Sequence, residues 1–360
     1  MTSLSDTIKR LAEQQAGHFG NSGQTSRLGD LGDFGPNPGR LAAKIYVPSP
    51  QEQAPALVVV LHGCTQSAAA YDNGSGWSRL ADEHGFILLF PEQRRENNAN
   101  LCFNWFSPGD IRRGEGEAFS VSQMIDIVCR QHEVDPKRVF ITGLSAGGAM
   151  ANVMLATYPE VFAGGAIIAG LPYDVASTVP EALERMRGYD LPPAALLSAK
   201  IVEASPHEGP WPLVSIWQGT EDHTVAEANA QGLVEQWRSV HGVASSSPKS
   251  SSSEGNHRIT RWEMEDGFAP IEFHSIDGMG HGTPIDTQSG LGIAAPFMLD
   301  VGVSSTAHIA RSWGLTPSFG RRSHPEAGQN DILPERPKLA PADGIQAIIE
   351  NALRSAGLMR

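Results

Sequence analysis

The chain has 360 residues, of which 40% are hydrophobic and 19% are charged. That composition supplies enough apolar side chains for a buried core and excludes a wholly disordered protein. Asp and Glu outnumber Lys and Arg by 40 to 27, which gives a formal charge of −13. Because an acidic surface repels phosphates, we expect no nucleic-acid partner. No apolar run approaches the ~20 residues of a membrane span, so we expect no membrane partner either.

The composition and the hydrophobic pattern along the chain predict a central domain with an extension at each end. Residues 1–39 are expected to form an amphipathic helix and a Gly-, Ser- and Asn-rich loop, and residues 316–360 a linker and a final amphipathic helix. Within the central domain, residues 40–315, the Pro- and Ala-rich segment 172–212 is a candidate cap. Residues 1–15 lack the continuous apolar stretch of ~7–15 residues that a signal peptide needs. The expected compartment is therefore the cytoplasm, with secretion by another route left open.

Short apolar runs alternate with helical patterns through the central domain. Strands are predicted at 56–61, 86–90, 138–142, 163–169, 212–218 and 271–276. Helices are predicted at 75–84, 119–132, 146–157, 225–240 and 304–313. Most of these strands are apolar on both faces, which is typical of an α/β fold with a mostly parallel sheet and helices on both faces. The Ser-rich segment 243–256 is expected to be an exposed loop.

A Gly-x-Ser-x-Gly motif lies at Gly143–Gly147, directly after a predicted strand and at the start of a predicted helix. This context is the one in which the motif forms a sharp turn that exposes a nucleophilic serine. The free N–H groups at the start of the helix stabilise negative charge that develops beside Ser145. The motif therefore predicts that Ser145 is a nucleophile, the alternative being an ordinary serine in a Gly-rich loop.

A nucleophilic serine needs a histidine base and a carboxylate that orients the histidine, which in α/β-hydrolases follow in the order Ser, acid, His. Asp222 lies just beyond the strand at 212–218, with Glu221 as the neighbour most easily confused with it. The alternative role for Asp222 is a turn or N-cap residue. His281 lies between glycines after the last core strand and is the predicted base, whereas His274 lies inside that strand and is expected to be structural.

Stabilising an oxyanion takes two backbone donors, one of which should be the N–H of Ala146. The second usually comes from the loop after the first core strand, which here contains His62-Gly-Cys-Thr-Gln66. The sequence resembles the polyhydroxybutyrate depolymerase family of α/β-hydrolase esterases in five motifs that occur in the family's order. They are this motif, Cys102-Phe-Asn-Trp-Phe106, Gly-Leu-Ser-Ala-Gly-Gly, Trp-Gln-Gly-Thr-Glu-Asp and Gly-His-Gly. The resemblance covers residues 40–313 and implies that Ser145, Asp222 and His281 are the catalytic triad. It also implies that the Cys64 N–H is the second oxyanion donor.

The resemblance has further implications for the cysteines and one tryptophan. It suggests that Cys64 and Cys102 form a disulfide that fixes the oxyanion loop, the alternative being two reduced, half-buried thiols. Cys129 is expected to be a core residue. Trp105 could wall the acyl pocket and bind substrate, or could be a core tryptophan. No metal or organic cofactor is implied.

The predicted function is therefore that of a serine esterase that hydrolyses carboxylic esters through an acyl-enzyme. The expected substrates are hydroxyalkanoate oligomers or short-chain esters. Related members of the family act on feruloyl and acetyl esters of plant polysaccharides, which are the first alternative. A serine peptidase or an acyltransferase on the same fold, and a non-catalytic binding protein, are the others. The chain shows no obvious second module for docking on a polymer, so crystalline extracellular polymer is not an expected substrate.

Overall fold

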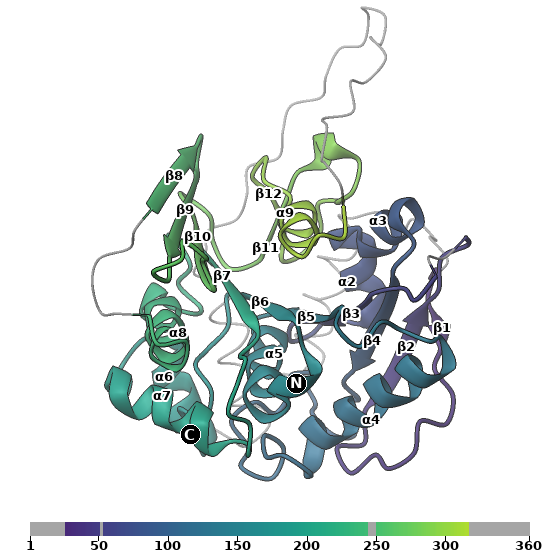
Figure 1. The fold of residues 1–360 in the computed structure, drawn as a ribbon, viewed down its shortest axis with the longest axis horizontal. Helices are drawn as coiled ribbons and strands as arrows, with labels where there is room; N and C mark the ends of the chain where they lie inside the picture. Colours follow the sequence, from purple (N-terminus) through teal and green to yellow (C-terminus); the bar gives the residue numbers. More distant parts are fainter. Residues whose placement is uncertain (1–25, 51–52, 244–249, 317–360) are drawn as a thin grey trace, which may run out of the picture.

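The computed structural model describes residues 26–50, 53–243 and 250–316. Among these residues, ten strands form one sheet in the order β1-β2-β4-β3-β5-β6-β7-β10-β9-β8 (Figure 1). The six strands from β4 to β10 are parallel, and the strands at both edges are antiparallel to their neighbours. Each parallel crossover therefore brings the loop after a strand to the same edge of the sheet, where α/β proteins bind their ligands.

The strands of the large sheet are β1 (Gly29–Asp30), β2 (Ala42–Tyr46), β3 (Leu57–Leu61), β4 (Ile87–Glu92), β5 (Val139–Leu144), β6 (Gly164–Ile168), β7 (Leu213–Gly219), β8 (Ser250–Glu254), β9 (His257–Trp262) and β10 (Ile271–Ile276). A second, two-stranded sheet joins β11 (Thr283–Ile285) to β12 (Met298–Asp300). The helices are α2 (Ala68–Ser75), α3 (Trp77–His84), α4 (Gly116–Gln131), α5 (Ala146–Thr157), α6 (Val179–Met186), α7 (Ala194–Glu203), α8 (Glu227–Val240) and α9 (Ser305–Ser312). Two 3₁₀ turns, η1 (Pro159–Val161) and η2 (Thr287–Ser289), complete the elements.

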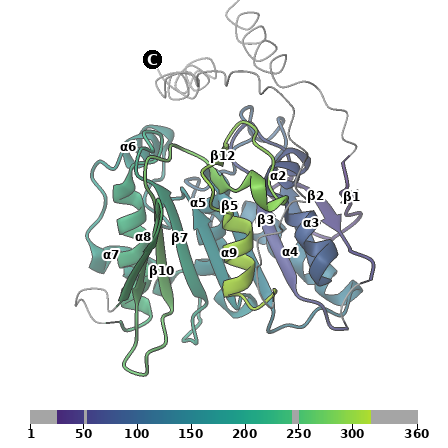
Figure 2. The same ribbon diagram turned by 90° about the horizontal axis from the view of Figure 1, so that it is seen from above.

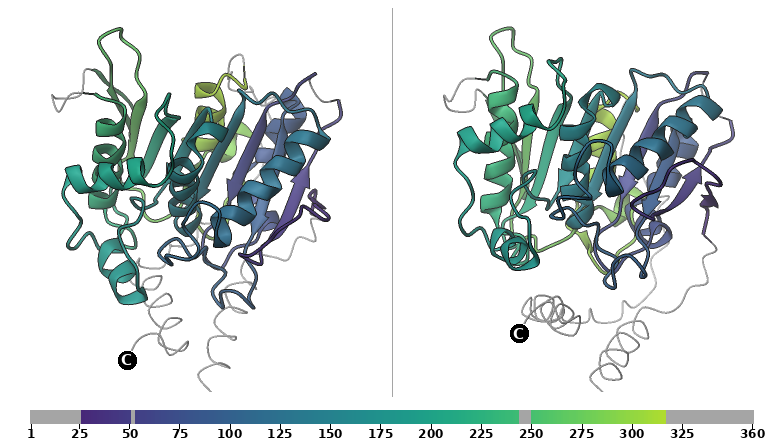
Figure 3. Two further views of the ribbon diagram at one scale, coloured as in Figure 1. Left: turned by 60° about the horizontal axis from the view of Figure 1, so that its bottom comes forward. Right: turned by 90° about the horizontal axis from the view of Figure 1, so that it is seen from below.

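Helices cover both faces of the sheet, as the run of two-sided apolar strands predicts. Figure 1 shows α4, α5 and α8 on one face and α2, α3 and α9 on the other. Figure 2 shows α9 in front of the central strands, and Figure 3 shows the opposite face with its helices lying along the sheet. Every side chain of β3 and of α5 is buried, so both elements lie between layers. Burial of such side chains is the main stabilising term of the fold.

Some boundaries differ from the sequence-based expectations. The sheet begins at β1, inside the segment expected to be a loop, and the Ser-rich segment contains β8. Both are edge strands that pair through backbone groups, and their side chains are exposed apart from half-buried Ser250, so no apolar alternation marks them. The helix expected at 75–84 is α3, which begins at Trp77, and α2 lies directly before it. The chain turns between the two helices at Gly76 with φ +78, where a Cβ would lie 2.1 Å from the Leu291 carbonyl oxygen.

The predicted terminal helices and the linker after residue 316 lie outside the described residues. The candidate cap contains α6 and α7, and α7 packs along α8. In the described part of the chain, no helix combines the length and the apolarity that crossing a bilayer requires.

Candidate active site

Ser145 occupies a sharp turn between the buried strand β5 and the buried helix α5. Its backbone has φ 57 and ψ −119, a conformation that side-chain-bearing residues rarely adopt. The Ser145 N–H donates to the Ile168 carbonyl at 2.9 Å, which ties the turn to the end of β6. Ser145 therefore lies at the edge of the sheet where the parallel strands end, at the N-terminus of α5.

The glycines of the motif are required by close backbone contacts. A Cβ on Gly143 would lie 2.3 Å from the Gly147 carbonyl oxygen, and a Cβ on Gly147 would lie 2.4 Å from the carbonyl oxygens of Leu61 and His62. Such distances are far inside van der Waals contact. The start of α5 therefore packs directly against the end of β3, which brings the turn at Ser145 beside the loop that contains Cys64.

Asp222 and His281 meet through a hydrogen bond of 2.7 Å between Oδ2 and Nδ1. Oδ1 of Asp222 accepts from the backbone N–H groups of Thr224 and Val225 at 2.9 and 2.8 Å, and Oδ2 also accepts from Gln218 Nε2 at 3.1 Å. The carboxylate is thus held by donors on both oxygens. An ionised carboxylate beside Nδ1 keeps the proton on that nitrogen and leaves Nε2 free to accept one.

The structure separates Asp222 from its neighbour Glu221. The Glu221 side chain is 63% exposed and lies 3.7 Å from His223. Asp222 is buried and contacts His281. Within the described part of the chain, no hydrogen bond joins Ser145 Oγ to the His281 ring, although both residues lie at the same edge of the sheet. Hydrogen bonds of this kind often tighten only when substrate is bound.

The loop that contains Cys64 is fixed to the loop after β4. Cys64 and Cys102 form a disulfide with a Cα–Cα distance of 4.2 Å. The Thr65 N–H donates to the Asn100 carbonyl at 2.7 Å, although Thr65 has a positive φ of 64. The Cys64 N–H makes no backbone hydrogen bond to any described residue. Its assignment as an oxyanion donor remains a prediction, as does that of the Ala146 N–H.

Trp105 and Cys129 are both largely enclosed. Trp105 is 6% exposed and packs in a small apolar cluster with Ala146, next to the disulfide and Phe106. Its predicted contact with substrate stays a prediction. Cys129 is a free, half-buried thiol that packs against the main core, and burial raises its pKa to about 11.

Phe297 is a neighbour of the site that the sequence did not reveal. It has a positive φ of 64, which is unusual for a bulky residue, and its ring lies edge-on to His281 with centroids 6.3 Å apart. Its carbonyl accepts from the Thr283 N–H at 2.8 Å, which holds the strained turn. Nothing in the local pattern around residue 297 distinguishes it, since the contact depends on the return of the chain to β11.

A cluster of aromatic rings lies on the strands that lead to Asp222 and His281. We call it the histidine cluster: Trp217, His257, His274 and His308. Trp217 and His274 stack with centroids 3.8 Å apart, His257 Nε2 lies 3.0 Å from His274 Nδ1, and His308 meets His257 edge-on at 5.2 Å. His274 is thus structural, as expected. Burial lowers the pKa of His274, that of His257 to about 3 and that of His308 to about 4.

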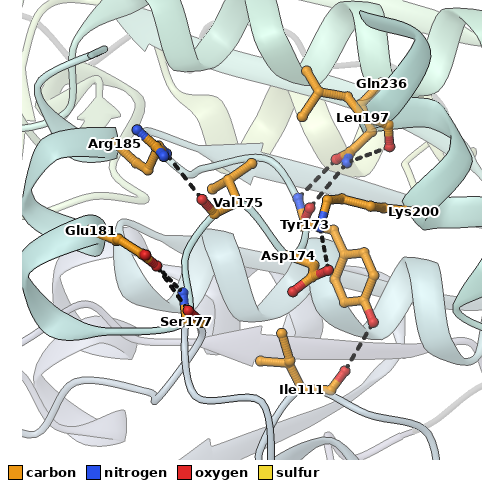
Figure 4. Close-up of polar contacts among 10 residues, drawn as sticks. All are labelled: Ile111, Tyr173, Asp174, Val175, Ser177, Glu181, Arg185, Leu197, Lys200 and Gln236. Carbon is orange, nitrogen blue, oxygen red and sulfur yellow. Dashed lines mark hydrogen bonds and ion pairs between the residues drawn. The ribbon is translucent and has the colours of Figure 1, made fainter. Parts of the chain in front are cut away.

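A groove away from the predicted site residues lies between the loop at 112–115, the loop after β6 and α7. Figure 4 shows that three of its polar side chains contact other groups of the protein: Lys200 pairs with Asp174, and Tyr173 donates to the Ile111 carbonyl, at 3.4 Å. The described residues contain no group of three or more His, Cys, Asp or Glu side chains placed to hold a metal ion.

Comparisons with known proteins agree on one family. The family model described as esterase PHB depolymerase matches residues 41–259. Poly(3-hydroxyalkanoate) depolymerase C of Paucimonas lemoignei is 44% identical over 299 residues, which cover 82% of this chain and 72% of the relative. Acetylxylan esterase A of Aspergillus oryzae is 32% identical over 265 residues, covering 72% of this chain and 85% of the relative.

A solved structure supports the same fold. The acetyl xylan esterase from Aspergillus awamori superposes with a TM-score of 0.69 at 24% identity, over 80% of this chain and 99% of that one. The predicted α/β-hydrolase fold and the predicted family are therefore confirmed. The chain belongs to the PHB depolymerase family of esterases and is a carboxylic ester hydrolase of the α/β-hydrolase fold.

Proposed function

We propose that the chain hydrolyses esters by a serine mechanism with an acyl-enzyme intermediate. His281 Nε2 takes the proton of Ser145 as its Oγ attacks the ester carbonyl carbon, and the carbonyl oxygen becomes an oxyanion. The N–H groups of Cys64 and Ala146 stabilise that oxyanion. His281 then protonates the leaving alcohol, and in the second half of the reaction it activates a water molecule that releases the acid.

The observation that carries this proposal is the 2.7 Å hydrogen bond between Asp222 and His281, at the edge of the sheet where the turn exposes Ser145. Donors contact both oxygens of Asp222 and hold the carboxylate next to the ring. It would stabilise the imidazolium that forms when His281 accepts the serine proton.

Ser145→Ala is the direct test of this mechanism. Loss of the nucleophile in such triads costs ~10⁶ in turnover. We expect hydrolysis of para-nitrophenyl acetate to fall by that order, with an unchanged melting temperature. A fluorophosphonate probe should label the unmodified protein and not the variant. Turnover by the variant close to that of the unmodified protein, after removal of contaminating esterases, would show that Ser145 is not the nucleophile.

We propose hydroxyalkanoate oligomers or short-chain esters as the substrates. The support is the 44% identity to a poly(3-hydroxyalkanoate) depolymerase. Acetyl esters of xylan are the second candidate, because relatives at about 30% identity are named acetylxylan esterases. Rates on 3-hydroxybutyrate oligomers, acetylated xylan, methyl ferulate and para-nitrophenyl esters of graded length would separate them. A preference of more than ~10-fold in kcat/KM, about 1.4 kcal/mol, identifies the better substrate.

A further inference from the structure

The oxyanion loop, residues 62–66, depends on the loop that follows β4. Besides the disulfide and the Thr65–Asn100 hydrogen bond, a third contact joins the two loops: the Gln93 N–H donates to His62 Nε2 at 3.1 Å. A backbone N–H can only donate, so His62 Nε2 carries no proton. His62 Nδ1 donates to the Gly63 carbonyl at 2.8 Å. His62 is therefore a neutral ring that bridges the two loops, and burial lowers its pKa.

A fully buried carboxylate, Glu117, holds the second of these loops. Its exposure is 0%, and it lies in the first turn of α4. Its two oxygens accept four hydrogen bonds: from Gln93 Nε2 at 2.6 Å, from Asn97 Nδ2 at 3.1 Å, and from the backbone N and Nδ2 of Asn104, both at 2.8 Å. We call Glu117, Gln93, Asn97 and Asn104 the Glu117 network. All three partners belong to the loop between β4 and α4, which also contains Cys102.

The partners of Glu117 are all hydrogen-bond donors, so a side chain that only accepts fits this position best. Every partner presents an N–H group, and an ionised carboxylate is the side chain that only accepts. The N-terminal end of a helix also stabilises negative charge. An amide at this position would direct one NH₂ group at donors, and a buried donor without an acceptor costs ~1–3 kcal/mol.

A chain of contacts runs from Glu117 to Cys64. Gln93 Nε2, which donates to Glu117, also donates to the Cys102 carbonyl at 2.9 Å. Cys102 is joined to Cys64 by the disulfide. Gln93 also contacts the other end of the oxyanion loop through its N–H and His62. The position of the Cys64 N–H is therefore determined from both sides by a loop that Glu117 holds.

We propose that Glu117 is a positioning residue for ester hydrolysis, which holds the Cys64 N–H where the ester oxygen becomes negative. This inference rests on the proposed function, because it assumes that the oxyanion forms at the Cys64 N–H. Removal of one oxyanion donor costs ~10²–10³ in kcat, and a displacement of ~1 Å can cost ~10². Glu117 touches neither substrate nor the reacting atoms, so its effect should fall on kcat and leave KM nearly unchanged.

Gln236 offers a matched control, because it is an equally buried side chain with four hydrogen bonds. It accepts from Asn152 Nδ2. It also accepts from the Tyr173 N–H and donates to the carbonyls of Tyr173 and Leu197 (Figure 4). It joins α8 to α5 and α7, away from the oxyanion loop. Gln236→Glu places an oxygen against two carbonyls, just as Glu117→Gln places an NH₂ group against donors. Both variants should be destabilised, and only one should lose turnover.

The experiment measures kcat and KM for para-nitrophenyl acetate, the rate of labelling by a fluorophosphonate, and the melting temperature. We expect Glu117→Gln to lose ~10–100-fold in kcat and in labelling rate, with KM within ~2-fold. Glu117→Asp, which keeps the carboxyl group, should recover part of the loss. Gln236→Glu should melt at a similarly reduced temperature and keep kcat within ~2-fold.

The outcomes distinguish this inference from the proposed function. Turnover in Glu117→Gln that falls no further than in the Gln236→Glu control overturns the positioning role. If Glu117→Gln does not fold, Asn97→Ala removes one donor of the network, and a loss of kcat below ~2-fold there also overturns it. An active Ser145→Ala variant would instead reject the serine mechanism itself, whatever Glu117 does.

Discussion

Two polar clusters in the interior, the Glu117 network and the histidine cluster, are stabilised in opposite ways. The Glu117 network lies behind the oxyanion loop and surrounds one acidic group with four N–H donors. The histidine cluster lies on the strands that lead to the acid and base, and packs neutral rings face to face and edge to face. In the first, the hydrogen bonds favour the ionised form of Glu117, but burial outweighs them and raises its pKa. In the histidine cluster, burial disfavours a positive charge on the rings.

The two clusters should therefore respond differently to pH. Burial raises the pKa of Glu117 to about 8, so folding becomes less favourable as pH rises from about 4.5 toward about 8. Burial lowers the pKa of His257 to about 3 and that of His308 to about 4, so the unfolded chain binds protons first. Stability is then lost as pH falls below about 6.5.

The largest expected effect lies in the chemistry itself, at the acid that follows β7. Asp222→Asn keeps the shape of the side chain and loses the charge that fixes the proton on His281 Nδ1. In a serine triad such a change lowers kcat ~10⁴-fold. We expect that loss for para-nitrophenyl acetate, while Glu221→Gln, with its exposed side chain, changes kcat less than ~2-fold. If Glu221→Gln loses kcat instead, Glu221 and not Asp222 is the acid of the triad.

The pH at which the protein unfolds in acid tests whether protonation of the histidine cluster destabilises the fold. His308→Phe replaces a half-buried ring that can be protonated by a ring that cannot, so we expect the variant to unfold at a lower pH than the unmodified protein. Each unit by which a histidine pKa is lowered corresponds to ~1.4 kcal/mol, so the effect should amount to a few kcal/mol near pH 4. Circular dichroism between pH 3 and 7 would give the midpoint. His223→Gln, at an exposed histidine, should leave it unchanged, and an unchanged midpoint in both variants would contradict this account.

The smallest effect expected is that of Trp105, which lies between the Glu117 network and Ser145. If Trp105 contacts the acyl chain, Trp105→Ala should lower kcat/KM ~5–150-fold, and more for octanoate than for acetate esters. If Trp105 only fills the apolar cluster around Ala146, the losses should be equal for all esters and accompany a lower melting temperature. Kinetics with para-nitrophenyl acetate, butyrate and octanoate, beside thermal melts, separate these outcomes.

The parts of the site that follow local rules were predictable from the sequence. The turn at Ser145 is recognisable because a strand, two glycines and a helix are adjacent in the chain. Asp222 and His281 could be chosen because they follow parallel strands, whose ends meet at one edge. The six core strands were found for the same reason, since strands buried on both faces are continuous apolar runs.

The remaining features depend on contacts between distant segments. Glu117 could not be recognised from the sequence as part of a buried network, because the Asn and Gln side chains that enclose it come from an irregular loop. The histidine cluster draws its rings from β7, β9, β10 and α9, and no spacing in the sequence links them. The edge strands β1 and β8 were missed because backbone pairing leaves no pattern in exposed side chains.

The state of the cysteines has a practical consequence for spectroscopic work on this enzyme. The chain has three cysteines, of which two are joined in the disulfide and the third, Cys129, is half-buried with its pKa raised to about 11. Maleimides react with thiolates, so all three should be slow to react near neutral pH in the folded protein. A single cysteine introduced on the exposed surface of α6 or β8 could therefore carry a fluorophore or spin label without prior removal of native residues.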